Sequence, residues 1–315
     1  MEAERIKTAV KLMQDGDKAS SKGLFKKPDW DIAGQNYEKA ATAFKVGKSY
    51  EQAVQAYTKA SDALLKADAT HLAGKSMESA AQILAQNLQQ PDRAADAYRR
   101  ASELFVTQGS VDRGAEQLEK AAKVMENVDV NAAIELYSQS CSLYEQEDRG
   151  RFAMDTFKKA IALLVKTQKY DRAMEMLHRQ SAVLQKLTNR GALYKANLSI
   201  VILALAMGDE VEASKQFHTF CSRDGGFPQS EEAEISDDLI KAYEHGDHEL
   251  LVKTVRRQNI TFLDNEIARL SRTLTVPGQS LGGGGYGAPS ARGYGAPSGP
   301  GGGPPKQPSY GDDLM

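Results

Sequence analysis

The amino-acid sequence repeats itself with a period of about 20 residues, and this repeat restricts the possible folds more than any other feature. Each copy has a small residue, a large apolar or aromatic residue four positions later, and usually another small residue three positions after that. The eight copies are Ala33-Tyr37-Ala40, Ala53-Tyr57-Ala60, Ala73-Met77-Ala80, Ala94-Tyr98-Ala101, Gly114-Leu118-Ala121, Ala133-Tyr137-Ser140, Ala153-Phe157-Ala160 and Ala173-Leu177-Gln180. Spacings of four and three place each triplet on one stripe of a helix, where small residues allow neighbouring helices to approach closely.

Each copy therefore predicts one helix and a short turn, and two copies make an antiparallel hairpin of about 40 residues. Ser49, Ser110 and Pro91 mark helix starts at the expected phase, and Ser49 with Gln52 is predicted to form a capping box. No segment alternates in the manner of a β-strand. We expect an all-α fold, in which residues 1–187 form a TPR-like solenoid of antiparallel helical hairpins.

The repeat loosens after residue 187, and a helical bundle over residues 188–275 is predicted to cap the solenoid. The longest apolar run, Leu198 to Met207, is half the roughly 20 residues that cross a bilayer, so it predicts a buried helix. Residues 276–315 are rich in glycine and proline and contain GYGAPS twice. Such a segment cannot bury enough apolar surface to fold, and we expect it to be disordered.

Composition and cysteine usage point to a cytoplasmic protein. The formal net charge of -2 gives no general attraction to nucleic acid, and the first twenty residues lack the apolar centre of a signal peptide. Cys141 and Cys221 lie far apart, which fits a reducing compartment, and we expect both to be small core residues. His245 and His248 form a close pair without a third ligand nearby, which favours a surface pair over a metal site.

The sequence gives little sign of an enzyme. It has no GxSxG, HExxH or CxxC motif, and its glycine-rich GGGGYG lacks the strand, helix and lysine of a phosphate-binding loop. Helical solenoids usually offer a binding surface rather than a closed reactive cleft. We therefore expect a binding protein that is not an enzyme and that uses no cofactor or metal.

A basic position recurs in the repeat two residues after each central residue. Six of the eight residues there are basic: Lys39, Lys59, Ser79, Arg100, Lys120, Gln139, Lys159 and Arg179. Because alternate helices belong to opposite layers, Lys39, Lys120 and Lys159 are expected to lie in one row. Two explanations stay open at this point: the row binds an acidic partner, or the position is simply exposed and lysine is a good helix former. Exposure explains the charge but not its uniform sign.

A contrasting acidic stretch runs from Glu231 to Glu249. It contains eight carboxylates and only one lysine, Lys241. Glu231 and Glu232 can be explained by the helix dipole after Ser230. The helix dipole does not explain the carboxylates later in the stretch. An acidic C-terminal end combined with the basic rows of the solenoid would let the chain bind an acidic partner and a basic partner at once.

The hairpins, the segments GLFKKPDWDIAGQNYEKAATAFKVGKSYEQA and MENVDVNAAIELY, and TVPG after the last expected helix together resemble the soluble NSF attachment proteins (SNAPs), most closely the gamma type. The resemblance covers nearly everything before the glycine-rich tail. It implies an adaptor, not an enzyme, that coats the four-helix SNARE bundle and recruits the hexameric ATPase NSF, which separates the bundle. It also implies peripheral attachment to the cytosolic face of endomembranes.

The resemblance assigns roles to several residues. Basic residues on one face of such proteins meet the acidic SNARE surface, and Lys159 falls at such a contact, with Lys120 and Lys39 in its row. The family's acidic C-terminal bundle engages NSF, which implicates the later carboxylates of the acidic stretch. These are Asp237, Asp238, Glu244, Asp247 and Glu249, of which Glu244 lies within the matching helix.

Two further segments acquire roles by resemblance. SNAPs carry an apolar loop that touches the bilayer, which here is Leu24 and Phe25 beside Lys26 and Lys27, whereas Trp30 is expected to pack at the start of the second helix. Alpha-type SNAPs end in an acidic pair and a leucine that promotes ATP hydrolysis by NSF. Here these are Asp312, Asp313 and Leu314, which follow a much longer spacer.

Two alternatives belong to other classes of function. A general TPR-like scaffold for peptide motifs, unrelated to SNARE recycling, shares the expected fold but needs neither the acidic bundle nor the apolar loop. A nucleic-acid role is suggested by the glycine and tyrosine tail, but Arg292 and Lys306 are its only basic residues, too few for strong phosphate binding.

Overall fold

The computed structural model describes residues 2–22 and 27–277. Over these residues it contains fifteen α-helices, two short 3₁₀ helices and no strand, which confirms the all-α prediction. The first eleven α-helices are α1 (Glu2–Ser20), α2 (Trp30–Val46), α3 (Tyr50–Lys66), α4 (Thr70–Gln86), α5 (Pro91–Thr107), α6 (Val111–Met125), α7 (Val130–Gln146), α8 (Met154–Lys166), α9 (Tyr170–Lys186), α10 (Arg190–Ala206) and α11 (Glu210–Arg223). The predicted disorder of the tail falls outside the described residues.

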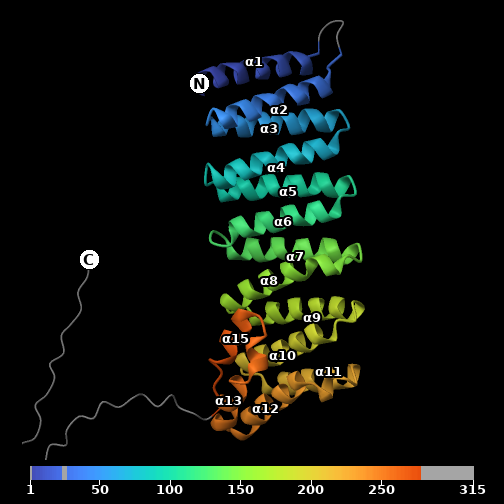
Figure 1. Ribbon diagram of the computed structural model, residues 1–315, viewed down its shortest axis with the longest axis vertical. Helices are drawn as coiled ribbons and strands as arrows, with labels where there is room; N and C mark the ends of the chain where they lie inside the picture. Colours follow the sequence, from blue (N-terminus) through green and yellow to red (C-terminus); the bar gives the residue numbers. More distant parts are fainter. Residues whose placement is uncertain (1, 23–26, 278–315) are drawn as a thin grey trace, which may run out of the picture. The chain divides into compact units, whose positions relative to one another are not determined.

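Consecutive helices run antiparallel and pack against each other in a stack (Figure 1). Side-chain bonds also join several of these helices to the helix two positions further on, as between Lys59 of α3 and Asp17 of α1, or Lys120 of α6 and Glu78 of α4. Helices of odd and even number therefore form two layers, called here the odd layer and the even layer.

The predicted triplets form the contact between the helices. Every one of their 24 residues is buried except Tyr57, which is half-buried and shares a hydrogen bond with Thr42 across 3.3 Å. Most of the alanines are fully inaccessible, whereas the larger central side chains fill the space between helices. Trp30 begins α2 as expected and packs beside Tyr37 and Ala33, with the Lys66 ammonium 4.3 Å from the centre of its ring.

A residue in the left-handed conformation ends most of the repeats. Its φ lies between 53° and 81° at Lys48, Asp68, Gln89, Gly109, Asp148, Gln168, Thr188 and Gly208. In most of these turns the next backbone N–H returns to a carbonyl five residues back, as from Asn189 to Leu184 at 3.0 Å. This bond closes the end of one helix and fixes the position at which the next begins.

The predicted capping box at Ser49 is wrong. Ser49 is the N-cap residue of α3, but its side chain makes no capping hydrogen bond. Asp129, by contrast, caps α7, where its carboxylate accepts two backbone N–H bonds.

The helices that follow the repeat fold back on its end. They are η2 (Phe227–Gln229), α12 (Glu231–His245), α13 (His248–Val255), α14 (Gln258–Thr261) and α15 (Asn265–Ser271), and η1 (Gly150–Ala153) lies earlier, before α8. Helix α12 packs on α10, and α15 packs on both α8 and α10. Leu198 to Leu205 of α10 are therefore buried on all sides, as the apolar run predicted.

Phe227 closes this C-terminal part of the fold. It is fully buried, with ring centres of Tyr194, Phe217 and Phe220 at 5.3 to 6.2 Å. Cys141 is buried in the core as expected, whereas Cys221 is only half-buried. The boundary at residue 187 between a solenoid and a C-terminal helical bundle stays a prediction. Within the described helices, none has the length and apolar character required to cross a membrane.

The left-handed turns can be tested at Thr188, a β-branched residue with φ 53°. Because this conformation costs a non-glycine residue roughly 1–2 kcal/mol, we expect Thr188→Gly to raise the free energy of unfolding by about 1 kcal/mol after the greater chain entropy of glycine is subtracted. The measurement is urea-induced unfolding followed by circular dichroism.

Gly208 provides the matched control, since it has φ 76° and a Cβ added there meets no atom within 4 Å. Gly208→Ala should lower the free energy of unfolding by about the same amount through the backbone alone. A loss of stability in Thr188→Gly would contradict this account of the turns.

Candidate interaction surfaces

The even layer contains a recurring carboxylate, placed one residue after the central residue of the repeat in α2, α4 and α6. Glu38 of α2, Glu78 of α4 and Glu119 of α6 occupy this position. Each accepts a hydrogen bond from the residue just before the centre of the helix two positions further on: from Ser76 at 2.7 Å, from Gln117 at 3.2 Å and from Thr156 at 2.8 Å. The three bonds are equivalent by the repeat.

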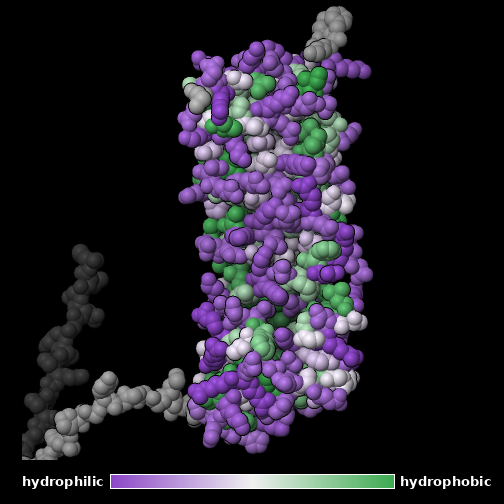
Figure 2. All heavy atoms as spheres, in the orientation of Figure 1, coloured by the Kyte–Doolittle hydropathy of each residue, from purple (hydrophilic) through white to green (hydrophobic). Residues whose placement is uncertain are grey.

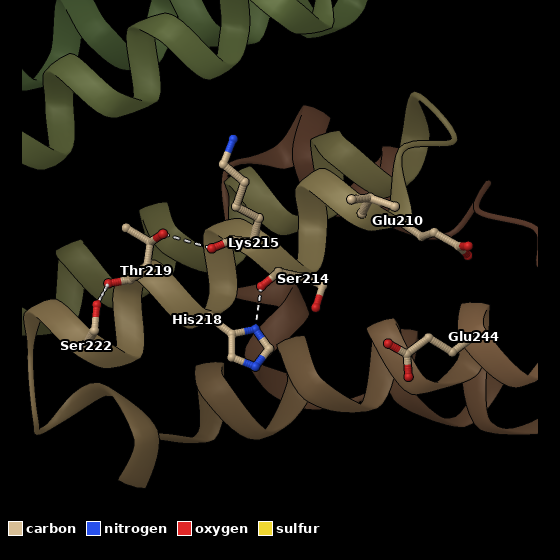
Figure 3. A pocket seen from close by; sticks show the side chains of 8 residues that line it. Glu210, Ser214, Lys215, His218, Thr219, Ser222 and Glu244 are labelled. Carbon is tan, nitrogen blue, oxygen red and sulfur yellow. Dashed lines mark hydrogen bonds between the residues drawn. The ribbon is translucent and has the colours of Figure 1, made fainter.

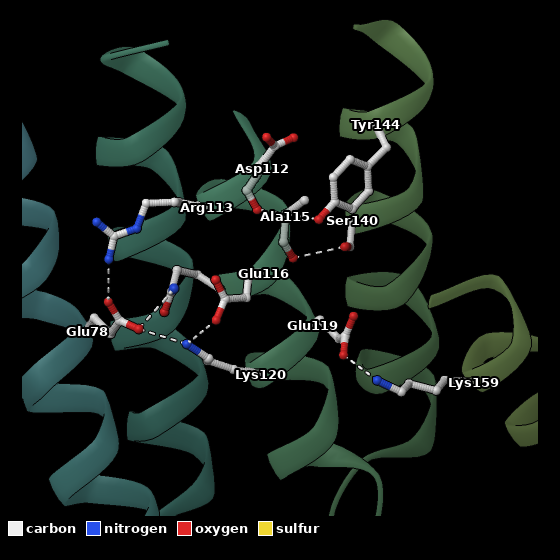
Figure 4. A network of polar contacts seen from close by, with 11 residues as sticks. Glu78, Asp112, Arg113, Ala115, Glu116, Glu119, Lys120, Ser140, Tyr144 and Lys159 are labelled. Atoms are coloured by element: carbon white, nitrogen blue, oxygen red, sulfur yellow. Dashed lines mark hydrogen bonds and ion pairs between the residues drawn. The ribbon is translucent and has the colours of Figure 1, made fainter. Parts of the chain in front are cut away.

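Two of these carboxylates also bind a basic residue of the predicted row. The Lys120 ammonium lies 2.7 Å from Glu78, and Lys159 forms an ion pair with Glu119 (Figure 4). Lys120 lies 2.8 Å from Glu116 of its own helix as well. Lys39 is exposed and takes part in no ion pair among the described residues. The structure thus places the three predicted residues on one layer but in different environments.

The odd layer is bridged in a similar way. Lys59 pairs with Asp17 at 2.9 Å, Arg100 pairs with Asp62, and Arg179 pairs with Glu145 while donating to Ser138 and Ser142. The uniform sign of the basic position therefore has an explanation that the sequence did not reveal. In five of its six basic copies the side chain neutralises a carboxylate of the preceding helix in its own layer.

Glu78 occupies the most heavily bonded position of the even layer. Burial acts to raise its pKa, but the hydrogen bond and charge of Lys120, with help from Gln117 and Arg113, hold that pKa below its ordinary value. The pKa of Lys120 is raised, because Glu116 and Glu78 outweigh the opposing effect of burial. Both groups are therefore charged at neutral pH.

Cations that take part in no ion pair within residues 2–22 and 27–277 also lie on the even layer. Lys75 of α4, Lys123 of α6 and Lys166 of α8 are exposed, at helical spacing from Ser79, Lys120 and Lys159 respectively. On the face drawn in Figure 2, hydrophilic residues predominate and hydrophobic ones are scattered rather than gathered into one patch. These observations favour a surface that binds its partner through charged rather than apolar contacts.

The acidic stretch divides into two parts in the structure. Asp237 and Asp238 are engaged within the fold: Asp237 lies 2.5 Å from Lys241, and Asp238 lies 2.6 Å from Arg257, which also bonds Glu234 at 3.0 Å. Arg257 thereby ties α12 to the segment after α13. Asp238 therefore helps to hold the C-terminal helices together, whereas the Asp237 pair lies within α12.

The other predicted carboxylates are presented to solvent. Asp247 and Glu249 are exposed at the start of α13, where the Asp247 side chain caps the helix by accepting from the N–H of Leu250. Glu244 is exposed on α12 and borders a groove of about 660 Å³, whose other lining residues, including Lys215 and His218, come from α11 (Figure 3).

The predicted membrane loop and terminal motif lie mostly outside the described residues. This applies to Leu24, Phe25 and Lys26, and to Asp312, Asp313 and Leu314, whereas Lys27 is described and exposed. His245 and His248 are both exposed. Within the described part of the chain, no three His, Cys, Asp or Glu side chains are grouped so as to hold a metal ion.

Comparison with known proteins gives consistent similarities along the chain. The sequence model of the family described as "Soluble NSF attachment protein, SNAP" matches residues 7–265. The chain is 34% identical over 285 residues to the gamma-soluble NSF attachment protein of Dictyostelium discoideum, covering 89% of this chain and 87% of that protein. It is 33% identical over 265 residues to the protein of the same name from Arabidopsis thaliana, covering 84% and 90%. The vesicular-fusion protein SEC17 of Komagataella phaffii is 26% identical over 249 residues, covering 75% and 81%.

The role of Glu78 in the even layer can be tested by substitution. Glu78→Gln keeps the shape but leaves Lys120 without its partner on α4, so we expect the free energy of unfolding at pH 7 to fall by about 1–3 kcal/mol, between the values for exposed and buried pairs. Because the folded pKa of Glu78 lies below its ordinary value near 4.5, this stabilisation is present above that pH and is lost as the pH falls through the folded pKa.

The difference between Glu78→Gln and the unmodified chain should therefore shrink as the pH is lowered from 7 toward 3, as measured by denaturant unfolding at each pH. Glu116→Gln is the matched control, since that side chain also contacts Lys120 but is 56% exposed. Equal losses of stability in both variants would show that Glu78 has no special part in joining α4 to α6.

Proposed function

The chain belongs to the soluble NSF attachment protein family, and from this premise we propose that it is an adaptor that binds assembled SNARE complexes and recruits the ATPase NSF to them. Members of this family are adaptors rather than enzymes. The observation that carries the proposal is the family match over residues 7–265, which takes in the helices from α2 to α14 and most of α1. The names of the relatives also associate the family with vesicle fusion.

The even layer is the proposed SNARE-binding surface, through Lys39, Lys120 and Lys159. The exposed Lys75, Lys123 and Lys166 support this choice, because they add positive charge on the same layer that no described carboxylate neutralises. A four-helix bundle with an acidic surface can lie along such a layer and contact several helices at once. Electrostatic attraction of this kind mainly sets the association rate and the orientation of the partner.

The C-terminal helices are the proposed NSF-binding region. Among the carboxylates assigned to this role, Glu244, Asp247 and Glu249 are accessible in the structure, whereas Asp237 and Asp238 are engaged in ion pairs. We therefore expect the exposed group to make the larger contribution. Asp312, Asp313 and Leu314 are proposed to act on ATP hydrolysis by NSF.

Residues 1–187 would thus contact the SNARE bundle and residues 188–275 would contact NSF. The loop that contains Leu24, Phe25, Lys26 and Lys27 is proposed to touch the membrane at the cytosolic face of endomembranes. Two apolar side chains give only weak, reversible attachment, so the loop would matter when a membrane-anchored SNARE complex already holds the protein nearby.

The adaptor role is tested by sequential binding. Immobilised, assembled SNARE complex should retain the protein, and the pair should then retain NSF in the presence of a nonhydrolysable ATP analogue. Lys159→Glu should weaken the first step by roughly tenfold, because it removes one favourable charge and adds a repulsive one. Deletion of Leu314 and Met315 should leave both binding steps intact and lower the stimulated ATP hydrolysis.

The proposed function would be refuted if the unmodified protein failed to bind the SNARE complex. If it bound but both variants behaved like the unmodified protein, the family would stand and these residue assignments would fail. Because Lys159 also neutralises Glu119, thermal unfolding of Lys159→Glu must show that the variant is folded before its binding is interpreted.

The membrane loop is tested by comparing SNARE complex anchored in liposomes with the same complex in solution. Leu24→Ser combined with Phe25→Ser should reduce binding to the anchored complex by several-fold and leave binding to the soluble complex unchanged, because only the former brings a bilayer to the loop. Ile32→Ser is a control at an exposed apolar residue just inside α2, with 50% of its surface accessible. Equal loss on both complexes would place Leu24 and Phe25 in the SNARE contact or in the fold instead.

A further inference from the structure

The series of ion pairs in the even layer is interrupted between α2 and α4. Glu38 accepts a hydrogen bond from Ser76 in the same way that Glu78 accepts one from Gln117. However, the position that supplies Lys120 to Glu78 and Lys159 to Glu119 is occupied by Ser79 on α4. A serine side chain is too short to cross to the neighbouring helix as the two lysines do (Figure 4).

A hollow of about 860 Å³ lies at this interruption. Ser79 and Lys75 of α4 line one side, and Lys39 and Val46 of α2 line the other, with Tyr57 of α3 contributing between them. Because the furrow between α2 and α4 is not bridged by a long basic side chain, it stays open to a side chain from outside.

Gln139 is the other residue at the recurring basic position that is not basic, and in the odd layer it too lies beside a hollow. Gln139 of α7 donates to Glu135 of its own helix at 3.2 Å, and it lines a hollow of about 460 Å³ between α5 and α7. Val106, Leu118 and Leu143 give that hollow an apolar wall. Both interruptions of the basic position thus coincide with an open furrow, one in each layer.

The two hollows differ in charge. The α2–α4 hollow is lined by Arg5, Lys39 and Lys75, none of which takes part in an ion pair among the described residues, and by the single carboxylate of Glu38. In the α5–α7 hollow the one cation, Arg99, lies 3.7 Å from Asp96 of its own helix. Charge complementarity therefore selects a carboxylate for the first hollow and gives no such preference to the second.

We propose that the α2–α4 hollow receives a carboxylate-bearing side chain from a helix of the acidic partner, and that Ser79 keeps the hollow open for it. This inference rests on the proposed function, which supplies the acidic helical partner. The carboxylate enters between α2 and α4, where Lys39 and Lys75 face it from the two walls and the hydroxyl of Ser79 can donate a hydrogen bond to it. The hollow adds shape selection to a surface that otherwise acts through charge alone.

Ser79→Lys distinguishes binding that depends on the open hollow from binding that depends only on the positive charge of the even layer. The new lysine occupies the position equivalent to Lys120, so it should pair with Glu38, fill the furrow and raise the melting temperature. If the even layer acts through charge alone, an added cation strengthens binding to an acidic partner. If the hollow receives a side chain, the same substitution weakens binding, and we expect the dissociation constant for soluble, assembled SNARE complex to rise roughly fivefold or more.

Gln139→Lys is the matched control, because it inserts the same residue at the equivalent position of the opposite layer. Its dissociation constant should stay within about twofold of the unmodified protein. A second variant keeps the hollow open and removes two of its three cations: Lys39→Gln combined with Lys75→Gln should weaken binding by roughly tenfold through the loss of two ion pairs. Isothermal titration calorimetry at fixed ionic strength measures all three.

Unchanged or tighter binding by Ser79→Lys overturns the proposal, as does unchanged binding by the double glutamine variant. These results leave the proposed function in place, provided that the unmodified protein binds. Failure of the unmodified protein to bind overturns the proposed function and the occupant of the hollow together. The two failures are therefore distinguishable.

Discussion

The left-handed turn that follows most helices of the stack is the constraint on which the rest of the fold depends. It ends a helix, returns the next backbone N–H to a carbonyl five residues back, and starts the following helix at a fixed offset. Because this offset hardly varies, the small residues of successive helices meet at the same depth and the helices can approach closely. Six of these positions hold a residue other than glycine, so packing between helices outweighs the conformational cost of the turn.

The same regular offset organises the polar surface. A carboxylate that follows the central residue of one helix comes to lie beside a basic residue of the next helix in its layer, and the arrangement recurs along the stack. Each such pair is partly exposed and contributes modestly to the stability of the fold. Together the pairs neutralise much of the charge on the two layers. Cations outside these pairs, such as Lys39 and Lys75, are therefore the ones available to a partner.

The two ends of the folded chain differ in how their charge is used. In the even layer the basic residues outnumber the carboxylates that they bind, whereas α12 and α13 retain exposed carboxylates after Arg257 and Lys241 are satisfied. The proposed adaptor role, with an acidic partner at one surface and a basic one at the other, calls for this separation, because mixed charge at either surface would weaken both contacts.

Sequence periodicity alone determined the helical class, the triplets that pack the core and the burial of the run from Leu198, because these follow from spacing within one helix. The resemblance added the family, which the comparisons bear out. The sequence could not show that Lys120 and Lys159 are bound to carboxylates, because their partners lie about two repeats away and the pairing depends on how helices stack in one layer. For the same reason Ser79 looked like a mere exception to a basic pattern. Only the tertiary structure places it opposite Glu38, where a short side chain leaves a furrow open that a lysine would bridge.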